Sequence, residues 1–444
     1  MNKNGTLISN GFWSLGTQII RVGSLALVTI ALCRHFGPQR FGSLAVGLAI
    51  VRIFAAFATF GLDRVIVRHL VDQQGFGVSV IYEGFWLKLT IAAFSYVAML
   101  GLILGVARGD TVLFLVAMLA GVGLLFQAAD VFDYVFQAQG DFRLSFLGRA
   151  VPILLCTGVK LGAIALNVSI IWFAALESVE AAVISATLYL CVRRTVPQPR
   201  RSSLPRKMLW PCLLAEGLPL VLGALAIMIY MRSDVIMLGK MIGYGAAGVY
   251  AAASQISEAC ALLPAALMST VFPVLLRSRN AGSMPYRRGL ERLFVSAVGI
   301  GLLFSLCLSV AASPIVRLVY GANYLAAAKV LVVHGWTIPF MFLAITQNAY
   351  DVGERLAWFA TFRMFVGALL NITLNLFLIP RYGVVGSALA TLIAQLFSAV
   401  LLNAIHPRTR PILRMQLMAM LLWPALRVMT RSRESRENRV WLPA

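Results

Sequence analysis

Charged side chains inside long apolar segments are the residues of this sequence that most need a chemical explanation. Arg21 and Arg52 each lie roughly ten residues from the nearest end of such a segment, and a charge at that depth of a bilayer costs roughly 2.5–3.5 kcal/mol on insertion scales. A residue in that position is usually paired, turned away from lipid or functional. We therefore predict a polar cavity in which Arg21 and Arg52 bind an anion.

Further intramembrane charges extend this set. Arg232 and Asp234 lie near one end of a predicted span, so facing water is the alternative to a role in the cavity. Asp133 forms an i,i+3 pair with Asp130, and snorkelling to the membrane surface is its alternative. Carboxylates in spans serve proton or sodium pathways as well as acid–base catalysis. We predict that Arg232 binds substrate and expect no catalytic residue. The residues predicted for gating or ion coupling are Asp234, Glu258 and Asp133.

A weak internal repeat places two of these charges at matched positions. Residues 41–47 align with residues 247–253, and in that register Arg52 falls on Glu258. Repeats of this kind are typical of transporters whose binding site lies near the midplane between two lobes. We expect Glu258 to pair with Arg52 when no substrate is bound.

The composition indicates a polytopic membrane protein. The 444 residues are 60% hydrophobic and 12% charged, a balance that soluble domains do not have. We predict an all-α fold of about twelve transmembrane helices in two six-helix bundles related by a parallel repeat. The predicted spans cover residues 12–33, 41–62, 82–106, 111–136, 144–166, 170–192, 213–238, 249–275, 293–312, 325–349, 358–379 and 384–405.

Basic connecting segments set the expected orientation and the internal boundary. The net charge of +21 comes from Arg-rich segments gathered on one side of the spans, which places both termini in the cytoplasm and argues against a nucleic-acid-binding surface. The Pro-rich, basic residues 193–207 are predicted to link an N-terminal bundle (1–192) to a C-terminal bundle (208–405). In the basic tail, 406–444, residues 412–428 are expected to lie on the membrane surface, with a short thirteenth span as the alternative.

Cysteines and histidines give no sign of a metal site or of a disulfide framework. The six cysteines lie in or beside apolar segments without CxxC spacing, and the four histidines are scattered. The chain does not begin with a short apolar core and an AxA-like site, so we expect no cleaved signal peptide. We predict no metal and no cofactor. Coupling to H⁺ or Na⁺ and the membrane potential are the energy sources left open.

Four stretches of the chain resemble a known family: NGFWSLGTQIIRVGSLALVTIALCRHFGPQRFG at 10–42, GLDRVIVRHL at 61–70, RSDVIMLGKMIGYGAAGVYAAASQISE at 232–258 and IPRYGVVGSALATLIAQL at 379–396. In them the chain is similar to the polysaccharide transporters, or lipid-linked oligosaccharide (O-antigen type) flippases, of the multidrug/oligosaccharidyl-lipid/polysaccharide exporter superfamily. The resemblance implies two bundles that face a central cavity lined by the first two helices of each half. Those helices hold Arg21, Arg52, Arg232, Asp234 and Glu258.

The resemblance also implies a function. A protein of this family moves an undecaprenyl-pyrophosphate-linked oligosaccharide across the bacterial inner membrane by alternating access, for lipopolysaccharide or exopolysaccharide biosynthesis. Arg21 and Arg52 would bind the pyrophosphate, because arginine binds phosphate groups through paired hydrogen bonds. The implied partners are the lipid-linked glycan, membrane lipids, a polysaccharide polymerase and chain-length proteins.

Three other classes of protein are alternatives. A drug/cation antiporter of the same superfamily is expected to hold a carboxylate in its first helix, where this chain has Arg21. A peptidoglycan lipid-precursor flippase usually carries helices beyond the twelve expected here. A membrane enzyme, such as a polysaccharide polymerase, needs a sizeable outer loop with polar catalytic residues, and every predicted outer loop is short. The sequence does not identify the glycan.

Overall fold

The structure is a computed structural model that describes residues 3–72, 77–106, 109–195, 206–268, 271, 275 and 283–421. Within these residues the regular secondary structure is helical and contains no strand, so the predicted all-α class is confirmed. The helices are α1 (Lys3–Thr59), α2 (Leu62–Asp72), α3 (Gly77–Val106), α4 (Thr111–Gly121), α5 (Gly123–Phe126), η1 (Gln127–Ala129), α6 (Asp130–Gln139), α7 (Phe142–Ala165), α8 (Ile170–Thr195), α9 (Arg206–Met241), α10 (Tyr244–Ala259), α12 (Ser283–Tyr320), η2 (Ala322–Tyr324), α13 (Ala326–Gly335), α14 (Ile338–Gly353), α15 (Ala357–Ala399), η3 (Leu401–Ala404) and α16 (Arg410–Met420).

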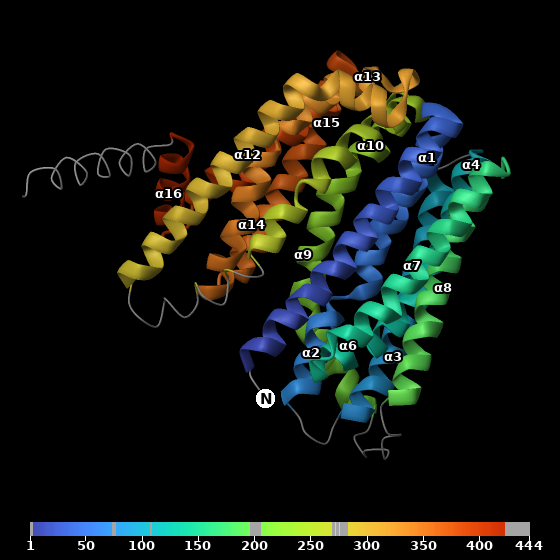
Figure 1. Ribbon diagram of the computed structural model, residues 1–444, viewed down its shortest axis with the longest axis vertical. Coiled ribbons are helices and arrows are strands. Elements are labelled where there is room, and N and C mark those ends of the chain that lie inside the picture. The colour runs from blue at the N-terminus through green and yellow to red at the C-terminus, as the bar shows by residue number, and fades with distance from the viewer. Residues whose placement is uncertain are drawn as a thin grey trace, which may run out of the picture.

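Several of these helices are long and apolar enough to cross a bilayer. The described residues contain nine such helical runs, or up to ten if the bent pair α13–α14 forms one span. With 57 and 43 residues, α1 and α15 are two to three times as long as the ~20 residues that a bilayer needs, and they are broken at Gly37 and Gly383. Figure 1 shows α2 back near the N terminus, so α1 crosses the bundle and returns. Counting α1 and α15 as two spans each is compatible with the predicted twelve.

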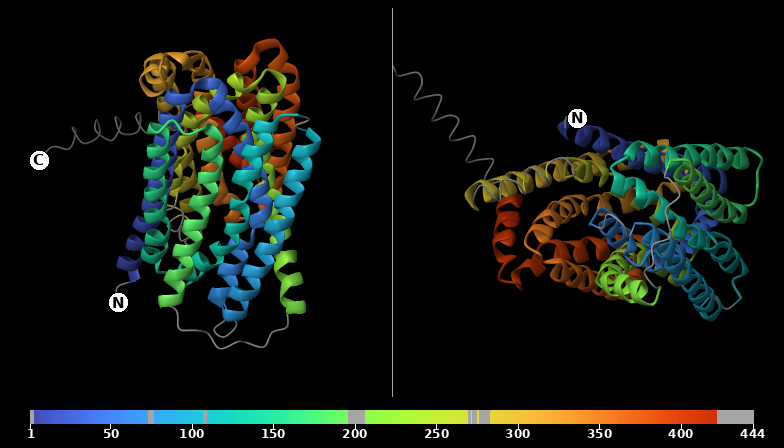
Figure 2. Two further views of the ribbon diagram at one scale, coloured as in Figure 1. Left: turned by 90° about the vertical axis from the view of Figure 1, so that its right-hand side faces the viewer. Right: turned by 90° about the horizontal axis from the view of Figure 1, so that it is seen from below.

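The two ends of the bundle differ in charge. The N terminus, the end of α8 and the start of α9 lie together at one end (Figure 2). Arg193 and Arg194 are in the last turn of α8, and Arg206 begins α9, so we call this the basic end. The turn that breaks α1 and the turn between α9 and α10 lie at the opposite end (Figure 1). The basic ends of α8 and α9 thus share one side, as predicted. That the other basic segments share it, and that this side is cytoplasmic, stays a prediction.

The helices form two halves that meet along α1. In Figure 1, α3 to α8 lie on one side of α1 and α12 to α16 lie on the other. The first helices of the C-terminal half, α9 and α10, pack along α1. The predicted linker, residues 193–207, falls largely on residues 196–205, which lie outside the described residues, so the boundary between the bundles stays a prediction.

At the opposite end the halves touch backbone to backbone. A Cβ atom on Gly42 of α1 would lie 1.7 Å from the Tyr244 carbonyl oxygen, and one on Gly248 of α10 would lie 2.2 Å from the Pro38 carbonyl oxygen. Each glycine thus faces the carbonyl of the residue four positions before the other glycine. Gly42 and Gly248 are matched in the register predicted from the sequence. This reciprocal contact is what a two-fold relation between the halves requires.

Both halves also contain an arginine–aspartate pair near the basic end, which is partly buried in the N-terminal half and fully buried in the C-terminal half. Arg149 of α7 binds Asp130 (2.8 Å) and Asp133 (3.1 Å) of α6. Arg363 of α15 binds Asp351 of α14, and both side chains are 3% exposed. The same type of pair therefore joins the fourth and fifth predicted spans of each half.

The described part of the tail is docked on the C-terminal half. Helix α16 has eleven residues, too few for the ~20 that a span needs, and it packs against α12 and η3. Gln416 is fully buried and donates to Gln347 Oε1 (3.0 Å), and Asn403 donates to Gln416 Oε1 (3.0 Å). Residues 410–420 therefore do not form a thirteenth span. The remainder of the predicted surface segment, 422–428, lies outside the described residues.

Candidate functional site

A large cavity lies between the two halves towards the basic end. Its volume is about 830 Å³. Most of its charged lining comes from the N-terminal half, where Arg52, Asp63, Arg64, Asp130 and Arg149 line it. The C-terminal half contributes a mainly apolar wall that includes Pro219, Leu220, Ile227, Met228, Trp358 and Met364. One wall of the cavity thus suits a charged or hydroxyl-rich guest and the other an apolar one.

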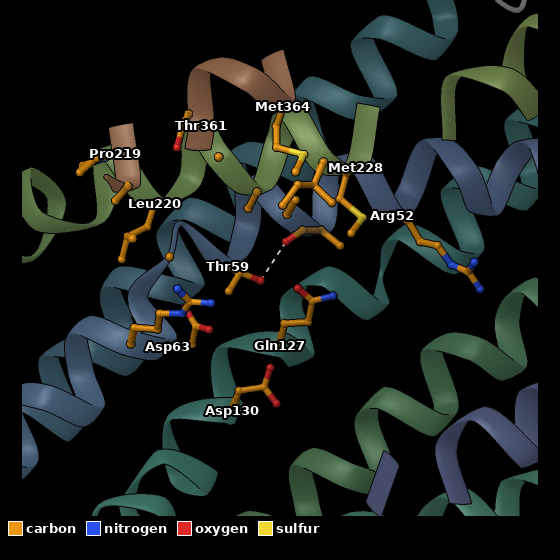
Figure 3. A pocket seen from close by; sticks show the side chains of 18 of the residues that line it. Arg52, Thr59, Asp63, Gln127, Asp130, Pro219, Leu220, Met228, Thr361 and Met364 are labelled. Carbon is orange, nitrogen blue, oxygen red and sulfur yellow. Dashed lines mark hydrogen bonds between the residues drawn. The ribbon is translucent and has the colours of Figure 1, made fainter. Parts of the chain in front are cut away.

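A small cavity of about 110 Å³ lies on the far side of Arg52 from the basic end. Arg52, Lys160, Glu177, Arg232 and Glu258 supply its charged lining. Arg52 is the charged residue that the two cavities share. Figure 3 shows Arg52 at the edge of the large cavity, with its guanidinium group directed away from Thr59 and Asp63. Arg52 therefore separates a wide chamber at the basic end from a narrow one beyond it.

Arg52 differs in its partners from the other two cations that line the small cavity, Lys160 and Arg232. Lys160 of α7 donates to Glu177 (2.6 Å) and Glu180 (2.7 Å) of α8. Arg232 of α9 donates to Glu258 of α10 (3.2 Å). Within the described part of the chain, Arg52 makes no ion pair.

The expected pair between Arg52 and Glu258 is therefore wrong for this conformation, because Glu258 binds Arg232 instead. The two acceptors nearest to Arg52 along the small cavity, Glu177 and Glu258, are each already bound to another cation. The guanidinium of Arg52 is thus available to an anionic guest.

Asp234 lies inside the C-terminal half, away from water. It is 2% exposed, so the alternative in which it faces water is wrong. Its carboxylate accepts hydrogen bonds from Tyr250 Oη (2.5 Å), Thr391 Oγ1 (2.6 Å) and Asn375 Nδ2 (2.6 Å). The position of Asp234 along its span gave the wrong exposure for its side chain, because α10 and α15 pack against α9 there.

Oxygen atoms gather around Asp234. Asn375 Nδ2 also lies 3.0 Å from the Asn371 carbonyl oxygen and 3.1 Å from Asn371 Oδ1, whereas Asn375 Oδ1 and Ser387 Oγ are buried without a hydrogen-bond partner. Half a turn of the Asn375 amide would bring its oxygen among these acceptors. A small space would then be surrounded by neutral and anionic oxygen atoms, and oxygen atoms are the ligands that hard cations prefer.

The two remaining predicted site residues lie outside both cavities. Asp133 is buried behind the large cavity, where Ser145 Oγ (2.5 Å), Gln137 Nε2 (2.8 Å) and Arg149 Nε (3.1 Å) donate to its carboxylate. Arg21 is exposed on the first half of α1 and lines neither cavity. The structure thus brings Arg52, Arg232 and Glu258 to one cavity, whereas Arg21 and Asp133 line neither cavity.

Several polar residues of the site were not identified from the sequence as site residues. Lys88 is fully buried, donates to Tyr134 Oη (2.8 Å) and lies 4.0 Å from Asp130, which lines the large cavity. Tyr250 and Thr391 complete the surroundings of Asp234, and only the i,i+4 spacing of Asn371 and Asn375 gave a sequence signal for that cluster.

The fold and the cavities define a two-lobed, multi-pass membrane transporter. The profile of the family described as "Polysaccharide biosynthesis protein" matches residues 7–279. The chain belongs to this family of polysaccharide transporters and flippases. It is also 28% identical over 185 residues to the probable flippase AglR of Haloferax volcanii, a match that covers 39% of this chain and 37% of that relative.

Solved structures with the same fold come from two kinds of transporter. The lipid II flippase MurJ in an inward closed conformation superposes with a TM-score of 0.69 at 13% identity, covering 94% of this chain and 92% of that one. The multidrug transporter DinF-BH gives a TM-score of 0.66 at 16% identity, covering 92% and 96%. At these identities the likeness establishes the fold alone.

Proposed function

We propose that the protein moves an undecaprenyl-pyrophosphate-linked oligosaccharide from the cytoplasmic to the periplasmic leaflet of a bacterial inner membrane. The observation that carries the proposal is the position of Arg52, which has no counter-ion among the described residues and lies between a large and a small cavity. A pyrophosphate is a compact polyanion, and the planar guanidinium group binds such groups through two parallel hydrogen bonds. In this orientation the basic end faces the cytoplasm, where both termini lie.

The lining of the cavities supports a route for the headgroup. The large cavity offers Arg64, Arg149 and, at its edge towards the small cavity, Arg52. Beyond Arg52 the small cavity offers Lys160 and Arg232. The headgroup would pass from the first set to the second as the halves tilt, while the sugars occupy the polar wall of the large cavity. The lipid tail would stay in the bilayer and pass through a gap that opens between the bundles.

The Asp234 cluster is the proposed coupling site. A buried carboxylate that only neutral groups surround can hold a proton or a Na⁺ ion, and its charge changes as the ion leaves. The amide oxygen of Asn375, whose nitrogen donates to Asp234, has no hydrogen-bond partner and would join an oxygen shell around such an ion once the amide turns. Glu258, which binds Arg232 in the small cavity, would act in gating, because an arriving anion competes with it for that arginine.

A drug/cation antiporter is the competing function with the same fold. The small cavity disfavours a cationic guest, because each of its acidic side chains, Glu177 and Glu258, is bound to a basic one, and Arg52 adds a positive charge that no described carboxylate neutralises. A peptidoglycan lipid-precursor flippase would share the pyrophosphate chemistry and differ in the glycan.

The test uses a strain that lacks the protein, rescued with the wild type, with Arg52→Ala or with the control Arg381→Ala, whose side chain is exposed at the opposite end. We expect the lipid-linked glycan to accumulate on the cytoplasmic leaflet. The wild type and Arg381→Ala should restore surface polysaccharide, and Arg52→Ala should not. Normal surface glycan without the protein, together with reduced efflux of a cationic dye, would establish the antiporter instead. Accumulation of peptidoglycan precursor would establish the second alternative.

A further inference from the structure

A group of metal-ligating side chains joins the two halves at the basic end, outside both cavities. His69 belongs to α2 in the N-terminal half, and Cys212 and Glu216 belong to α9 in the C-terminal half. Their ligand atoms all lie within 4.8 Å of one another. We propose that these three residues form a binding site for a divalent transition metal of the zinc class, which ties the two halves together.

The distances fit tetrahedral coordination. His69 Nε2 lies 3.1 Å from Glu216 Oε2, and Cys212 Sγ lies 3.8 Å from Glu216 Oε1. Ligands at the usual Zn–N, Zn–O and Zn–S lengths of about 2.0–2.3 Å are separated by about 3.3–3.5 Å at the corners of a tetrahedron. Each separation is close to that of a metal shell, but the two involve different oxygens of Glu216, so its carboxylate must rotate to present one oxygen to a metal that His69 and Cys212 also bind. Water would supply the fourth ligand, as in zinc sites with three protein ligands.

The chemical types of the ligands select the metal. A thiolate and an imidazole favour zinc-class ions over Mg²⁺ and Ca²⁺, which take oxygen ligands. Cys212 and Glu216 are one helical turn apart on α9, so both side chains leave the same face of that helix. Binding would release the thiol proton of Cys212 to water, since the metal binds the thiolate.

The backbone that carries the ligands is held in place by apolar packing. Leu62, Val65 and Ile66 of α2 belong to the same buried cluster as Leu209 and Leu213 of α9. These contacts flank the ligands along both helices. The three side chains are therefore presented by a formed helix–helix interface, and only side-chain rotations are needed to close the shell.

Arg68 is the competitor for this site. Its Nη2 lies 2.5 Å from Glu216 Oε2, the oxygen that His69 also contacts, and its side chain is 58% exposed. A metal ion would displace this exposed guanidinium from Glu216. Removal of Arg68 should therefore strengthen metal binding, which a purely structural role for the cluster would not produce.

A bound metal would restrain the motion of the halves. This consequence rests on the proposed alternating access, whereas the site itself does not. A metal that links α2 to α9 opposes any separation of these helices at the basic end, so it should slow transport reversibly.

The test measures binding directly on the full-length protein in lipid nanodiscs, with Zn²⁺ as the probe against a fluorescent chelator. We expect one ion per chain for the wild type and for Cys307→Ser, which alters another exposed cysteine. Binding should be at least about tenfold weaker in His69→Gln and Cys212→Ser, and severalfold tighter in Arg68→Gln.

A second measurement needs no variant. Zn²⁺ should protect Cys212 of the wild-type protein from a maleimide, as followed by peptide mass spectrometry, and Mg²⁺, which prefers oxygen ligands, should not. Equal labelling of Cys212 with and without Zn²⁺, or binding that His69→Gln and Cys212→Ser leave unchanged, would overturn the proposal. Zinc binding with normal transport would leave the site in place and remove its restraining role, whereas failure of the Arg52 experiment would not bear on it.

Discussion

At their basic ends the two halves of the protein contain the same kind of ion pair, Arg149 with Asp133 and Arg363 with Asp351, whereas at mid-height they hold opposite charges at matched positions, Arg52 and Glu258. The shared pairs join neighbouring helices within a half. Arg52 and Glu258 line the small cavity between the halves, whereas Arg149 and Asp351 line the large one. The comparison indicates that the ion pairs common to both repeats stabilise the fold, and that the charges in which the repeats differ determine what the small cavity binds.

The shared pairs give the largest expected effect. Asp351→Asn would leave Arg363 buried and without its carboxylate, which typically costs about 3–5 kcal/mol of stability. The matched variant Asp133→Asn should cost clearly less, because Arg149 keeps Asp130 at 2.8 Å. Thermal unfolding of both variants in nanodiscs measures the difference. Equal losses would show that the two pairs do not differ in this way. An altered ion dependence of Asp133→Asn at unchanged stability would instead support the ion-coupling role predicted for Asp133.

Substitution of Arg52 or Glu258, the opposite charges at matched positions, gives the next largest effect. The two substitutions should change the substrate affinity in opposite directions. Arg52→Gln should weaken substrate affinity by one to two orders of magnitude, because hydrogen bonds to charged groups contribute about 1.5–3 kcal/mol. Glu258→Gln should raise the affinity severalfold and slow release, since it frees Arg232 from its partner. The apparent affinity for lipid-linked glycan in proteoliposomes is the measurement. A loss of affinity in both variants would contradict the assignment of Glu258 to gating.

A third difference between the halves gives the smallest effect. Asp234 has no counterpart among the predicted N-terminal site residues, and Asp234→Asn keeps the shape of the side chain while it removes the charge. We expect transport to fall roughly five- to tenfold, about 1–1.4 kcal/mol, and to lose its response to the coupling ion. Initial rates under separate Na⁺ and pH gradients identify that ion. The control Asp63→Asn, in the large cavity, should keep the response, and a retained response in Asp234→Asn would exclude this coupling site.

The sequence predicted the helices well because long apolar runs have few alternatives in a bilayer. It also placed Arg52 and Glu258 correctly at matched positions, since the repeat keeps the register of the glycines. It did not predict which charges pair. Whether Arg232 or Arg52 reaches Glu258 depends on the rotation of α9 and α10 about their axes, and no local pattern encodes that rotation.

Long-range neighbours account for the other errors. Asp234 lies near the end of its span, yet it is buried because Thr391 and Asn375, far along the chain, pack around it. His69 and Cys212 have no motif spacing, because they come from different halves and meet only through the packing of α2 on α9. Contacts between residues of different halves were therefore the hardest to predict from the sequence.

The contact between Gly42 and Gly248 has a consequence for repeated cycling. If a contact between the halves consists of side chains, these side chains lose rotamer freedom each time the contact forms. The cost is up to about 1.5–2 kcal/mol for each long side chain. Glycine has no rotamers, so at this point the halves can part and rejoin without that entropic cost. The surface that re-forms is also the same each time, because backbone atoms in a helix have a single arrangement. This crossing can therefore close after every transport event with the same fit and the same free energy.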